Sequence, residues 1–286
     1  MRVISIIAKP HAENIEVLLR KIISFLRNNN IELLFDKRTA SIIKSTTFVE
    51  EEEIRLKSNL IIVIGGDGTL LSAARILKGK ETPIIGINMG RLGFLTEIKA
   101  EEAINMLEDF LSGKASIEKR MKLDCKLMED NTEVFQSEVL NDVVINKGAL
   151  ARMIDIELVI DGQFVNALRA DGIIFSTPTG STAYNLAAGG PIVYPELNSI
   201  IITPICPHSL THRPIVISKN SKINISIKNN YENIFLTCDG QIGRRLNKDS
   251  SNDIIITKAN TYVKLVTSSN RNYYSLLKEK LRWGQN

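Results

Sequence analysis

The sequence predicts an α/β domain with a parallel sheet, followed by a β-rich domain. Up to about residue 116, short β-branched runs such as 60–64 alternate with stretches of helical periodicity such as 70–77. From about residue 117, short strand-like runs follow one another with turn residues between them, and one short helix near 182–188 interrupts them. Alternating strands and helices favour βαβ units, which bind ligands at the carboxyl ends of their strands.

In the first domain, each expected element has its own sequence signal. The stretch 14–28 places Ile15, Leu18, Leu19 and Ile22 on one apolar face, and three asparagines end it. The polar stretch 36–57 carries an acidic block at 50–53, which is typical of a solvated helix face. The expected strands are 3–8, 31–35, 60–64 and 82–87, and the expected helices are 14–28, 70–77 and 100–111.

In the second domain, Asp161-Gly162 is a good hairpin turn between two of the expected strands. The expected strands are 123–128, 134–145, 154–160, 164–168, 173–175, 200–203, 214–217, 223–227, 234–237, 254–257 and 262–266. The tail from 275 to 283 becomes helical again, and there is no low-complexity linker.

The composition is that of a soluble globular protein, with 44% hydrophobic and 24% charged residues among 286. The net charge is +4 and there is no long basic block, so we expect neither nucleic acid nor membrane as a partner. This charge is compatible with a local binding site for a small anionic molecule. The three cysteines are widely spaced and lack a CxxC pair, which favours free thiols in the cytoplasm. We therefore expect a soluble cytoplasmic protein.

The loop 65–69, with the sequence GGDGT, lies between the expected strand 60–64 and the expected helix 70–77. A glycine-rich loop leading into a helix directs backbone N–H groups toward a phosphate. The candidates for phosphate contact are Gly65, Gly66, Gly68 and Thr69. The carboxylate of Asp67 in the middle indicates a reacting hydroxyl or a metal between it and the phosphate. The alternative is a tight turn in which Asp67 or Thr69 caps the helix, although three glycines in four positions are costly for that purpose.

A second constellation lies at 176–182, where five hydroxyl-bearing residues surround Pro178 and Gly180 just before a helix. Hydroxyls and free N–H groups suit the ribose, phosphate and base edges of a nucleotide. The alternative is an ordinary Ser/Thr-rich turn with a helix cap. Tyr184 by itself is more often a core or interface aromatic than a base-stacking one.

Taken together, these segments resemble the NAD kinase family over nearly the whole chain. The GGDGT loop alone is weak evidence for this family, because lipid kinases and phosphofructokinases carry a similar loop. The long motif NMGRLGFL, at its distance from the loop, is the specific signal. The matching segments are 65–69, 88–95, Asn141-Asp142, 171–172, 176–184, 188–191, 207–210 and 213–214.

The resemblance implies an α/β domain of residues 1–116 and 268–286, because the C-terminal segment returns to it, and a β-rich dinucleotide-binding domain of residues 117–267. It also implies transfer of the terminal phosphoryl group of ATP to the 2′-hydroxyl of the adenosine ribose of NAD, which makes NADP. This reaction depends on a divalent metal cation, with Mg²⁺ expected. A homo-oligomer, a tetramer or a dimer, is implied as well.

For individual residues, the resemblance places Asp67 on the family's proton acceptor, with Gly68 beside it in the dinucleotide site. Asn141 and Asp142 match the pair that contacts the bound nucleoside, where many relatives have Asn-Glu. The other implied dinucleotide contacts are Arg152, Arg169, Asp171, Thr182, Ala183, Tyr184, Asn185, Leu186, Ala187 and Gln241.

Structural explanations remain open for several of these residues. Asp142 could cap a strand end, Arg152 and Arg169 could be solvated, and Asp239-Gly240 could be only a hairpin turn. The role of Asp67 as base or as magnesium ligand also stays open, and the metal ligands are unknown. The two histidines that lie near prolines lack a third partner at metal-ligand spacing, so we interpret them as structural; they are His208 and His212.

Two other functions are weighed against the kinase. A lipid kinase of the diacylglycerol or sphingosine type shares the glycine-aspartate loop, but no exposed apolar or basic segment for a membrane is visible. A non-catalytic dinucleotide sensor would keep the pocket and have no need of Asp67, which is present. The absence of a Walker A motif and of a strict GxGxxG argues against P-loop and dehydrogenase-type binding.

Overall fold

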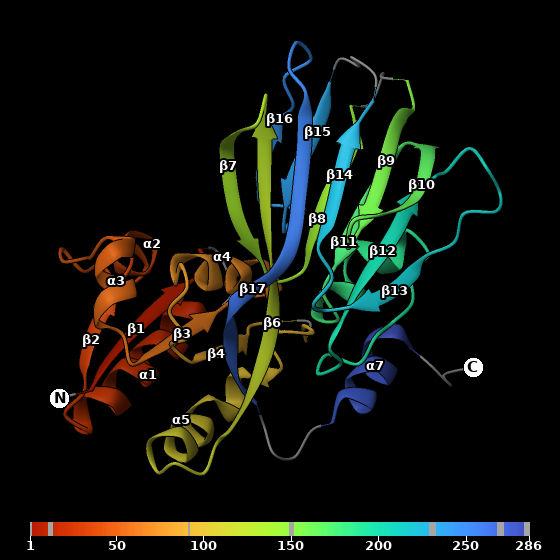
Figure 1. The fold of residues 1–286 in the computed structure, drawn as a ribbon. Helices are drawn as coiled ribbons and strands as arrows, with labels where there is room; N and C mark the ends of the chain where they lie inside the picture. The colour runs from red at the N-terminus through yellow and green to blue at the C-terminus, as the bar shows by residue number, and fades with distance from the viewer. Residues whose placement is uncertain are drawn as a thin grey trace. The chain divides into compact units, whose positions relative to one another are not determined.

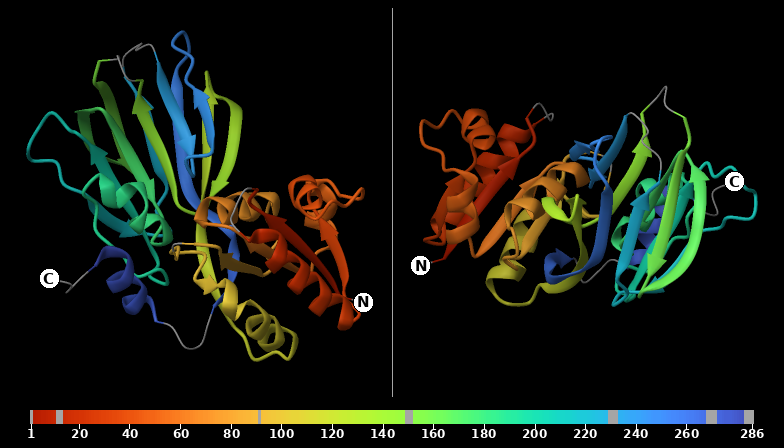
Figure 2. Two further views of the ribbon diagram at one scale, coloured as in Figure 1. Left: turned by 180° about the vertical axis from the view of Figure 1, so that it is seen from behind. Right: turned by 45° about the horizontal axis from the view of Figure 1, so that its top comes forward.

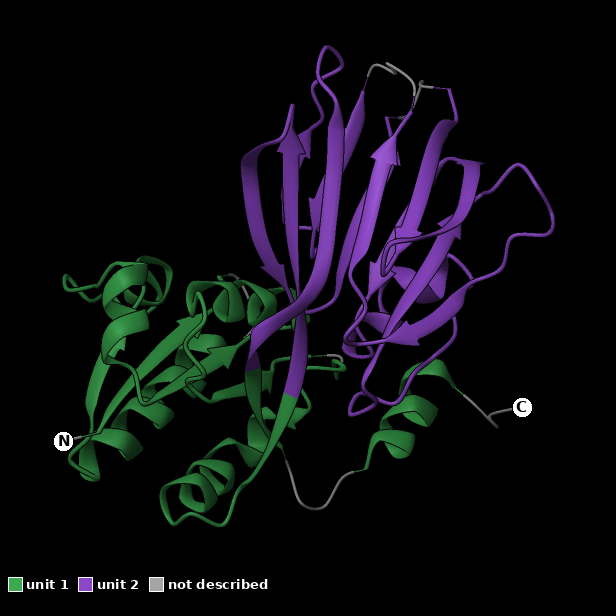
Figure 3. Ribbon diagram, in the orientation of Figure 1, with its two compact units in different colours: residues 1–119, 263–286 green, residues 120–262 purple. Residues whose placement is uncertain are grey.

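The computed structural model describes residues 2–10, 14–90, 92–148, 152–228, 233–267 and 272–282. The chain forms two compact units, and Figure 3 colours them separately. Unit 1 contains residues 1–119 and 263–286, and unit 2 contains residues 120–262. Two long strands, β6 (Ser116–Glu129) and β17 (Asn252–Thr267), each contribute residues to both units.

Unit 1 is built on parallel strands in the order β4-β3-β1-β2, with the end of β17 parallel to β4 (Figure 1). The strands are β1 (Val3–Ala8), β2 (Glu32–Phe35), β3 (Leu60–Ile64), β4 (Ile84–Asn88) and the short β5 (Ile98–Lys99). The helices are α1 (Ile15–Asn28), α2 (Lys37–Ile42), α3 (Glu51–Lys57), α4 (Asp67–Ile76), η1 (Ala100–Glu102), α5 (Ala103–Leu111) and α7 (Tyr273–Leu281).

Strand β3 shows why this sheet lies in the interior, because all five of its residues are buried. Successive side chains of a strand point to opposite faces. Leu60, Ile62 and Ile64 join the core cluster that α1 and α5 also enter, and Ile61 and Val63 point to the opposite face. The expected parallel sheet between helices is confirmed, and it places the loop 65–69 at the carboxyl end of a central strand.

Unit 2 consists of antiparallel strands in two layers, which Figure 2 shows from two further directions. One layer has the order β13-β12-β11-β8-β15-β16, and the other contains β10-β9-β14-β17 and the β6–β7 pair. Buried side chains from both layers form one apolar core. The further elements are β7 (Thr132–Val139), β8 (Asp142–Lys147), β9 (Ile154–Ile160), β10 (Gln163–Ala170), β11 (Gly172–Ser176), η2 (Thr179–Thr182), α6 (Tyr184–Ala187), β12 (Ser199–Ile205), β13 (Ile215–Ser218), β14 (Ile223–Ile227), β15 (Ile234–Cys238) and β16 (Ile242–Arg245).

The structure corrects several element predictions. The expected strand 134–145 is two strands, β7 and β8, separated at Leu140 and Asn141. The expected strands 254–257 and 262–266 are one continuous strand, β17, because the residues between them stay extended. This strand pairs with β14 through 253–256, with β4 through 265–266, and also with β6. Strands β5 and β16 are additional to the predicted ones.

The helical tail is α7, and the last residue predicted for it, Trp283, lies outside the described residues. None of the helices that the structure describes has the length and apolar character needed to span a bilayer.

Candidate active site

Asp67 is the first residue of α4, and Gly66 occupies the cap position after the buried strand β3. Among the described residues, no side chain caps this helix. The alternative interpretation, in which Asp67 or Thr69 serves as the helix cap, is therefore wrong. Gly65 is buried, Gly68 is exposed, and Asp67 and Thr69 are partly exposed. The helix start is thus accessible to a ligand, as a phosphate loop requires.

The Asp67 carboxylate is held by the backbone of the segment after β4. Its Oδ2 accepts a hydrogen bond from Phe94 N at 2.9 Å. Its Oδ1 accepts from Leu95 N and Thr96 N, both at 3.0 Å, and from the Thr96 hydroxyl, also at 3.0 Å. The motif 88–95 and the GGDGT loop are separate signals in the sequence, and the structure brings them together at this carboxylate. Arg91, within the motif, lies outside the described residues.

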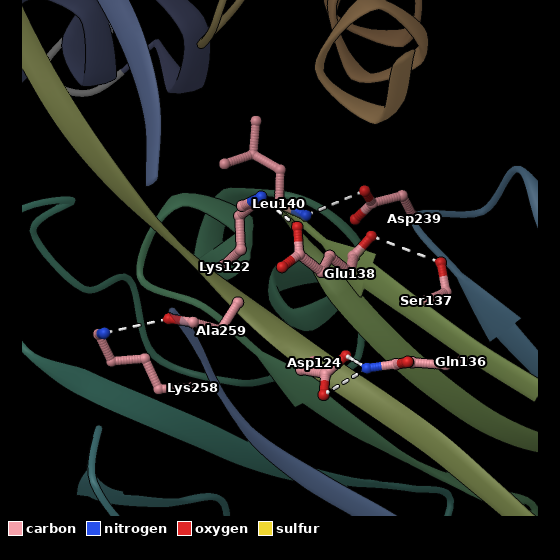
Figure 4. Close-up of polar contacts among 9 residues, drawn as sticks. All are labelled: Lys122, Asp124, Gln136, Ser137, Glu138, Leu140, Asp239, Lys258 and Ala259. Carbon is pink, nitrogen blue, oxygen red and sulfur yellow. Dashed lines mark hydrogen bonds and ion pairs between the residues drawn. The ribbon is translucent and has the colours of Figure 1, made fainter. Parts of the chain in front are cut away.

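In unit 2, Asp239 occupies a turn with φ of 51°, followed by Gly240 with φ of 62°. Its carboxylate accepts hydrogen bonds from Leu140 N at 3.0 Å, Asn141 N at 2.7 Å and Asp142 N at 3.2 Å. Figure 4 shows the contact with Leu140. These bonds occupy N–H groups that a continuous strand would use, which is why the chain breaks between β7 and β8. Asp239-Gly240 is therefore more than a hairpin turn.

The segment 176–182 packs against this break through its hydroxyl groups. Thr177 donates through N to Asn141 O at 2.8 Å and through Oγ1 to Leu140 O at 2.6 Å. A β-carbon on Gly180 would lie 2.2 Å from Asn141 O, so only glycine fits there. Ser181 is fully buried and donates to the carbonyl of Pro178 at 2.7 Å. The expectation that these hydroxyls face a nucleotide is thus wrong for Thr177 and Ser181, because buried hydroxyls satisfy the chain's own carbonyls.

A cavity of about 300 Å³ opens at the break between β7 and β8. It brings together four of the predicted residues, and Tyr184, 44% exposed, is one of them. The predicted residues in its lining are Asn141, Asp142, Ala183 and Tyr184, and the others are Val144, Asn146, Thr237, Asp239 and Gly240. The sequence does not single out Val144, Asn146 and Thr237, because such residues are ordinary members of strands. For Asp239-Gly240, a hairpin turn is a sufficient explanation at the level of sequence.

Asp142 is the electrostatically unusual member of this lining. It is 4% exposed. Burial, together with the charge of Asp239, raises the pKa of its carboxyl to about 7. Asp239 accepts three backbone N–H groups, and such bonds favour the ionised form of a carboxyl. The cavity therefore holds one carboxyl that titrates near neutral pH beside a structural carboxylate.

The remaining predicted residues do not line this cavity. Arg152 and Gln241 are exposed, and Arg169 Nε lies 3.9 Å from Asp155 Oδ1. Asp171 forms an ion pair with Lys147 on β8, with 3.2 Å between Asp171 Oδ1 and Lys147 Nζ. The predicted residues around α6 that are partly or fully exposed are Thr182, Leu186 and Ala187.

Asn185 is fully buried, and its side-chain amide forms hydrogen bonds within unit 2. Its Nδ2 donates to Ser181 O at 3.1 Å and to Pro191 O at 3.0 Å. Its Oδ1 accepts from Thr203 Oγ1 at 2.6 Å. This side chain holds the segment around α6 in place from inside.

A prepared metal site is absent from the residues that the structure describes. No group of three or more His, Cys, Asp or Glu side chains is placed to hold an ion there. His212 instead pairs its Nδ1 with Asn166 Nδ2 at 2.9 Å, in keeping with the structural interpretation of this histidine.

Two family models match the chain. The ATP-NAD kinase N-terminal domain matches residues 4–115, and the ATP-NAD kinase C-terminal domain matches residues 140–268. Similar curated proteins include the NAD kinases of Trichlorobacter lovleyi and Geotalea daltonii, each 42% identical, with 100% of both chains covered.

Two solved structures are also similar. The yeast NADH kinase complexed with NADH has a TM-score of 0.92 at 25% identity, and the match covers 100% of this chain and 89% of that one. An NAD kinase from Archaeoglobus fulgidus in complex with ATP has a TM-score of 0.79 at 26% identity, and the match covers 98% and 99%. Family models over both halves and full-length relatives at this identity show that the chain belongs to the NAD kinase family and is a kinase that phosphorylates NAD.

Proposed function

We propose that Asp67 accepts the proton of the ribose 2′-hydroxyl of NAD as that oxygen attacks the γ-phosphorus of ATP. The new O–P bond gives NADP, the bond between the γ-phosphorus and the β,γ-bridging oxygen breaks, and ADP leaves. A ribose hydroxyl is a weak nucleophile, so a positioned carboxylate that orients it and takes its proton assists the transfer.

The single observation that carries this role is the uneven hydrogen bonding of the Asp67 carboxylate. An ionised carboxylate has about four lone-pair sites, two on each oxygen. Among the described residues, Oδ1 receives three hydrogen bonds and Oδ2 receives one, from Phe94 N. This pattern leaves acceptor capacity on Oδ2, where a substrate hydroxyl can donate.

The cavity of unit 2 supports a nucleoside site. Asn141 and Asp142 supply polar groups, and Tyr184 supplies an aromatic face beside Ala183. We assign the phosphate loop to Gly65, Gly66, Gly68 and Thr69, because the N-terminus of α4 attracts negative charge through the helix dipole. The N–H groups of Gly65 and Thr69 already donate to Ile87 O and Gly66 O, both at 2.9 Å. We assign the other dinucleotide contacts by family resemblance, namely Gly68, Arg152, Arg169, Asp171, Thr182, Leu186, Ala187 and Gln241. Asn185, which the resemblance also implies, is fully buried, and we assign it the role of holding α6 in place.

A magnesium ion fits this chain as a companion of ATP. Mg²⁺ commonly binds substrate phosphates and water with few protein ligands. When bound, the ion supplies neutralisation of the phosphate charge.

A homo-oligomer, tetramer or dimer, in the cytoplasm completes the proposal. The edge strands β10 and β13 expose Phe164, Val165 and Val216. The unpaired backbone groups of such apolar edge strands can pair with another chain, and contact with a second subunit would cover them. Free cysteines, which include the exposed Cys206, suit a reducing compartment. Light scattering at assay concentration tests the assembly, and a fully active monomer would reject it.

The activity test is incubation of the purified protein with NAD, ATP and magnesium, followed by detection of NADP with an NADP-specific dehydrogenase. Asp67→Asn is nearly isosteric, so it should fold and bind NAD. Its turnover should fall by about two orders of magnitude or more, as for loss of a positioned general base. Turnover within about threefold of the parent would remove Asp67 from the reaction, since a lost decade already equals about 1.4 kcal/mol.

A further inference from the structure

Thr96 stands between Asp67 and a second buried polar side chain. Its hydroxyl donates to Asp67 Oδ1 at 3.0 Å and accepts from Asn88 Nδ2 at 3.1 Å. Asn88 is itself fixed, because its Oδ1 accepts from Gly90 N at 2.7 Å. Thr96 is fully buried and Asn88 is 7% exposed. The three side chains form a directed chain of hydrogen bonds that ends on the carboxylate.

The direction of this chain is fixed by its first member. The Asn88 amide nitrogen can only donate, so the Thr96 hydroxyl uses an acceptor site for it and directs its one hydrogen to Asp67. A buried hydroxyl with both roles filled stays in one orientation. Asp67 Oδ1 therefore receives a hydrogen bond from a hydroxyl whose orientation is fixed by Asn88.

The backbone donors alone restrain the carboxylate less completely. Leu95 N and Thr96 N come from adjacent residues of one segment. Loss of the hydroxyl would leave Oδ1 with these two neighbouring donors and permit more rotation of the carboxylate. Since the proposed role of Asp67 depends on which oxygen stays available, this rotation would disturb the reacting geometry.

We infer that Thr96, supported by Asn88, is a positioning residue that holds Asp67 Oδ1 and thereby presents Oδ2 to the substrate hydroxyl. The inference rests on the proposed role of Asp67. Thr96 acts through Asp67, so its loss should affect turnover, and the affinity for NAD should change little.

The experiment compares Thr96→Val, which keeps the shape and removes the hydroxyl, with Thr96→Ser, which keeps the hydroxyl. Thr96→Val should lower kcat about tenfold with KM for NAD within about twofold, the mark of an interaction that matters in the transition state. Thr96→Ser should restore kcat to within about threefold of the parent.

The matched control is Thr82→Val, because Thr82 is also a buried threonine of unit 1. The Thr82 hydroxyl donates to Ser58 O at 3.3 Å. Thr82 lies just before β4 in the chain, and Thr96 lies after it. This variant should lose some thermal stability and keep its kcat and its KM for NAD. Asn88→Ala is the second probe, since it removes the support of the Thr96 hydroxyl without touching Asp67. It should lower kcat as Thr96→Val does, by less, and leave KM for NAD within about twofold of the parent.

The outcomes separate the two claims. An active Asp67→Asn would overturn the proposed role of Asp67. An inactive Asp67→Asn together with parent-like Thr96→Val and Asn88→Ala would overturn only the role of Thr96. In the Asp67→Asn background, Thr96→Val should cause little additional loss, because residues that act through one group are not additive. Full additivity would assign Thr96 a separate structural effect and reject the inference.

Discussion

Gly93 lies against the carboxylate of Asp67, so that a β-carbon at residue 93 would be 2.0 Å from Asp67 Oδ1 and 2.5 Å from Thr96 Oγ1. Gly93 N also donates to Thr96 O at 3.2 Å, which closes the turn that holds the carboxylate. Only glycine permits this close approach, because it carries no β-carbon.

Gly93→Ala should therefore displace Asp67 and lower kcat by about two orders of magnitude, as loss of a positioned general base does. The overpacking should also cost about 1–3 kcal/mol of stability. Steady-state kinetics and thermal unfolding of one preparation measure both effects. Gly243→Ala is the matched control, because the nearest atom to its added β-carbon would be Thr237 Oγ1 at 4.0 Å. Turnover of Gly93→Ala equal to that of this control would show that the close approach does not matter.

The buried carboxyl of Asp142 should make stability depend on pH near neutrality. Its pKa is raised to about 7, above the usual value of 3.8, so the folded protein binds this proton more tightly than the unfolded chain. The resulting stabilisation is complete below the unfolded pKa and is lost as the pH rises through about 7. Asp142→Asn removes the titration, so its unfolding midpoint in urea should exceed that of the parent at pH 8 by more than at pH 5.

The difference in the free energy of unfolding between Asp142→Asn and the parent should be larger at pH 8 than at pH 5 by at least about 1 kcal/mol. The reason is that one pKa unit corresponds to about 1.4 kcal/mol. Asp249→Asn provides the control, since Asp249 is exposed and its substitution should leave the pH dependence unchanged. Parallel pH dependences in Asp142→Asn and the parent would exclude Asp142 as the titrating group.

Asp239 should control affinity for NAD through the backbone that it holds. Asp239→Ala removes the acceptor for three N–H groups, those of Leu140, Asn141 and Asp142. Each unsatisfied buried donor costs about 1–3 kcal/mol, so the break between β7 and β8 should relax and the lining of the cavity should shift. KM for NAD should rise by about tenfold or more, equivalent to about 1.4 kcal/mol, with a smaller change in kcat.

The comparison for Asp239→Ala is Asp124→Ala on β6. Asp124 accepts two hydrogen bonds from the exposed Gln136 side chain, at 2.9 and 3.0 Å, and Figure 4 shows this pair as well. Its loss should leave KM for NAD within about twofold of the parent. Equal KM values in Asp239→Ala and Asp124→Ala would mean that the Asp239 turn does not support the nucleoside site.

Elements with local signals could be predicted from the sequence. The buried run of β3, the apolar face of α1 and the hairpin at Asp161-Gly162 all follow from periodicity and turn chemistry, and the structure has them at the expected positions. The resemblance to the NAD kinase family likewise depends on motifs within short segments, and the family models and relatives confirm it.

The hydrogen bonds between distant segments became known only from the folded chain. Asp67 and Thr96 are separated by 29 residues, and Asp239 and Asn141 by 98, yet each carboxylate satisfies backbone N–H groups of the other segment. Neither pairing leaves a periodic signal, because a carboxylate can accept from any N–H group that the fold brings within reach. For the same reason, the sequence does not reveal that the hydroxyls of Thr177 and Ser181 serve the interior, since either a carbonyl or a ligand can face a hydroxyl.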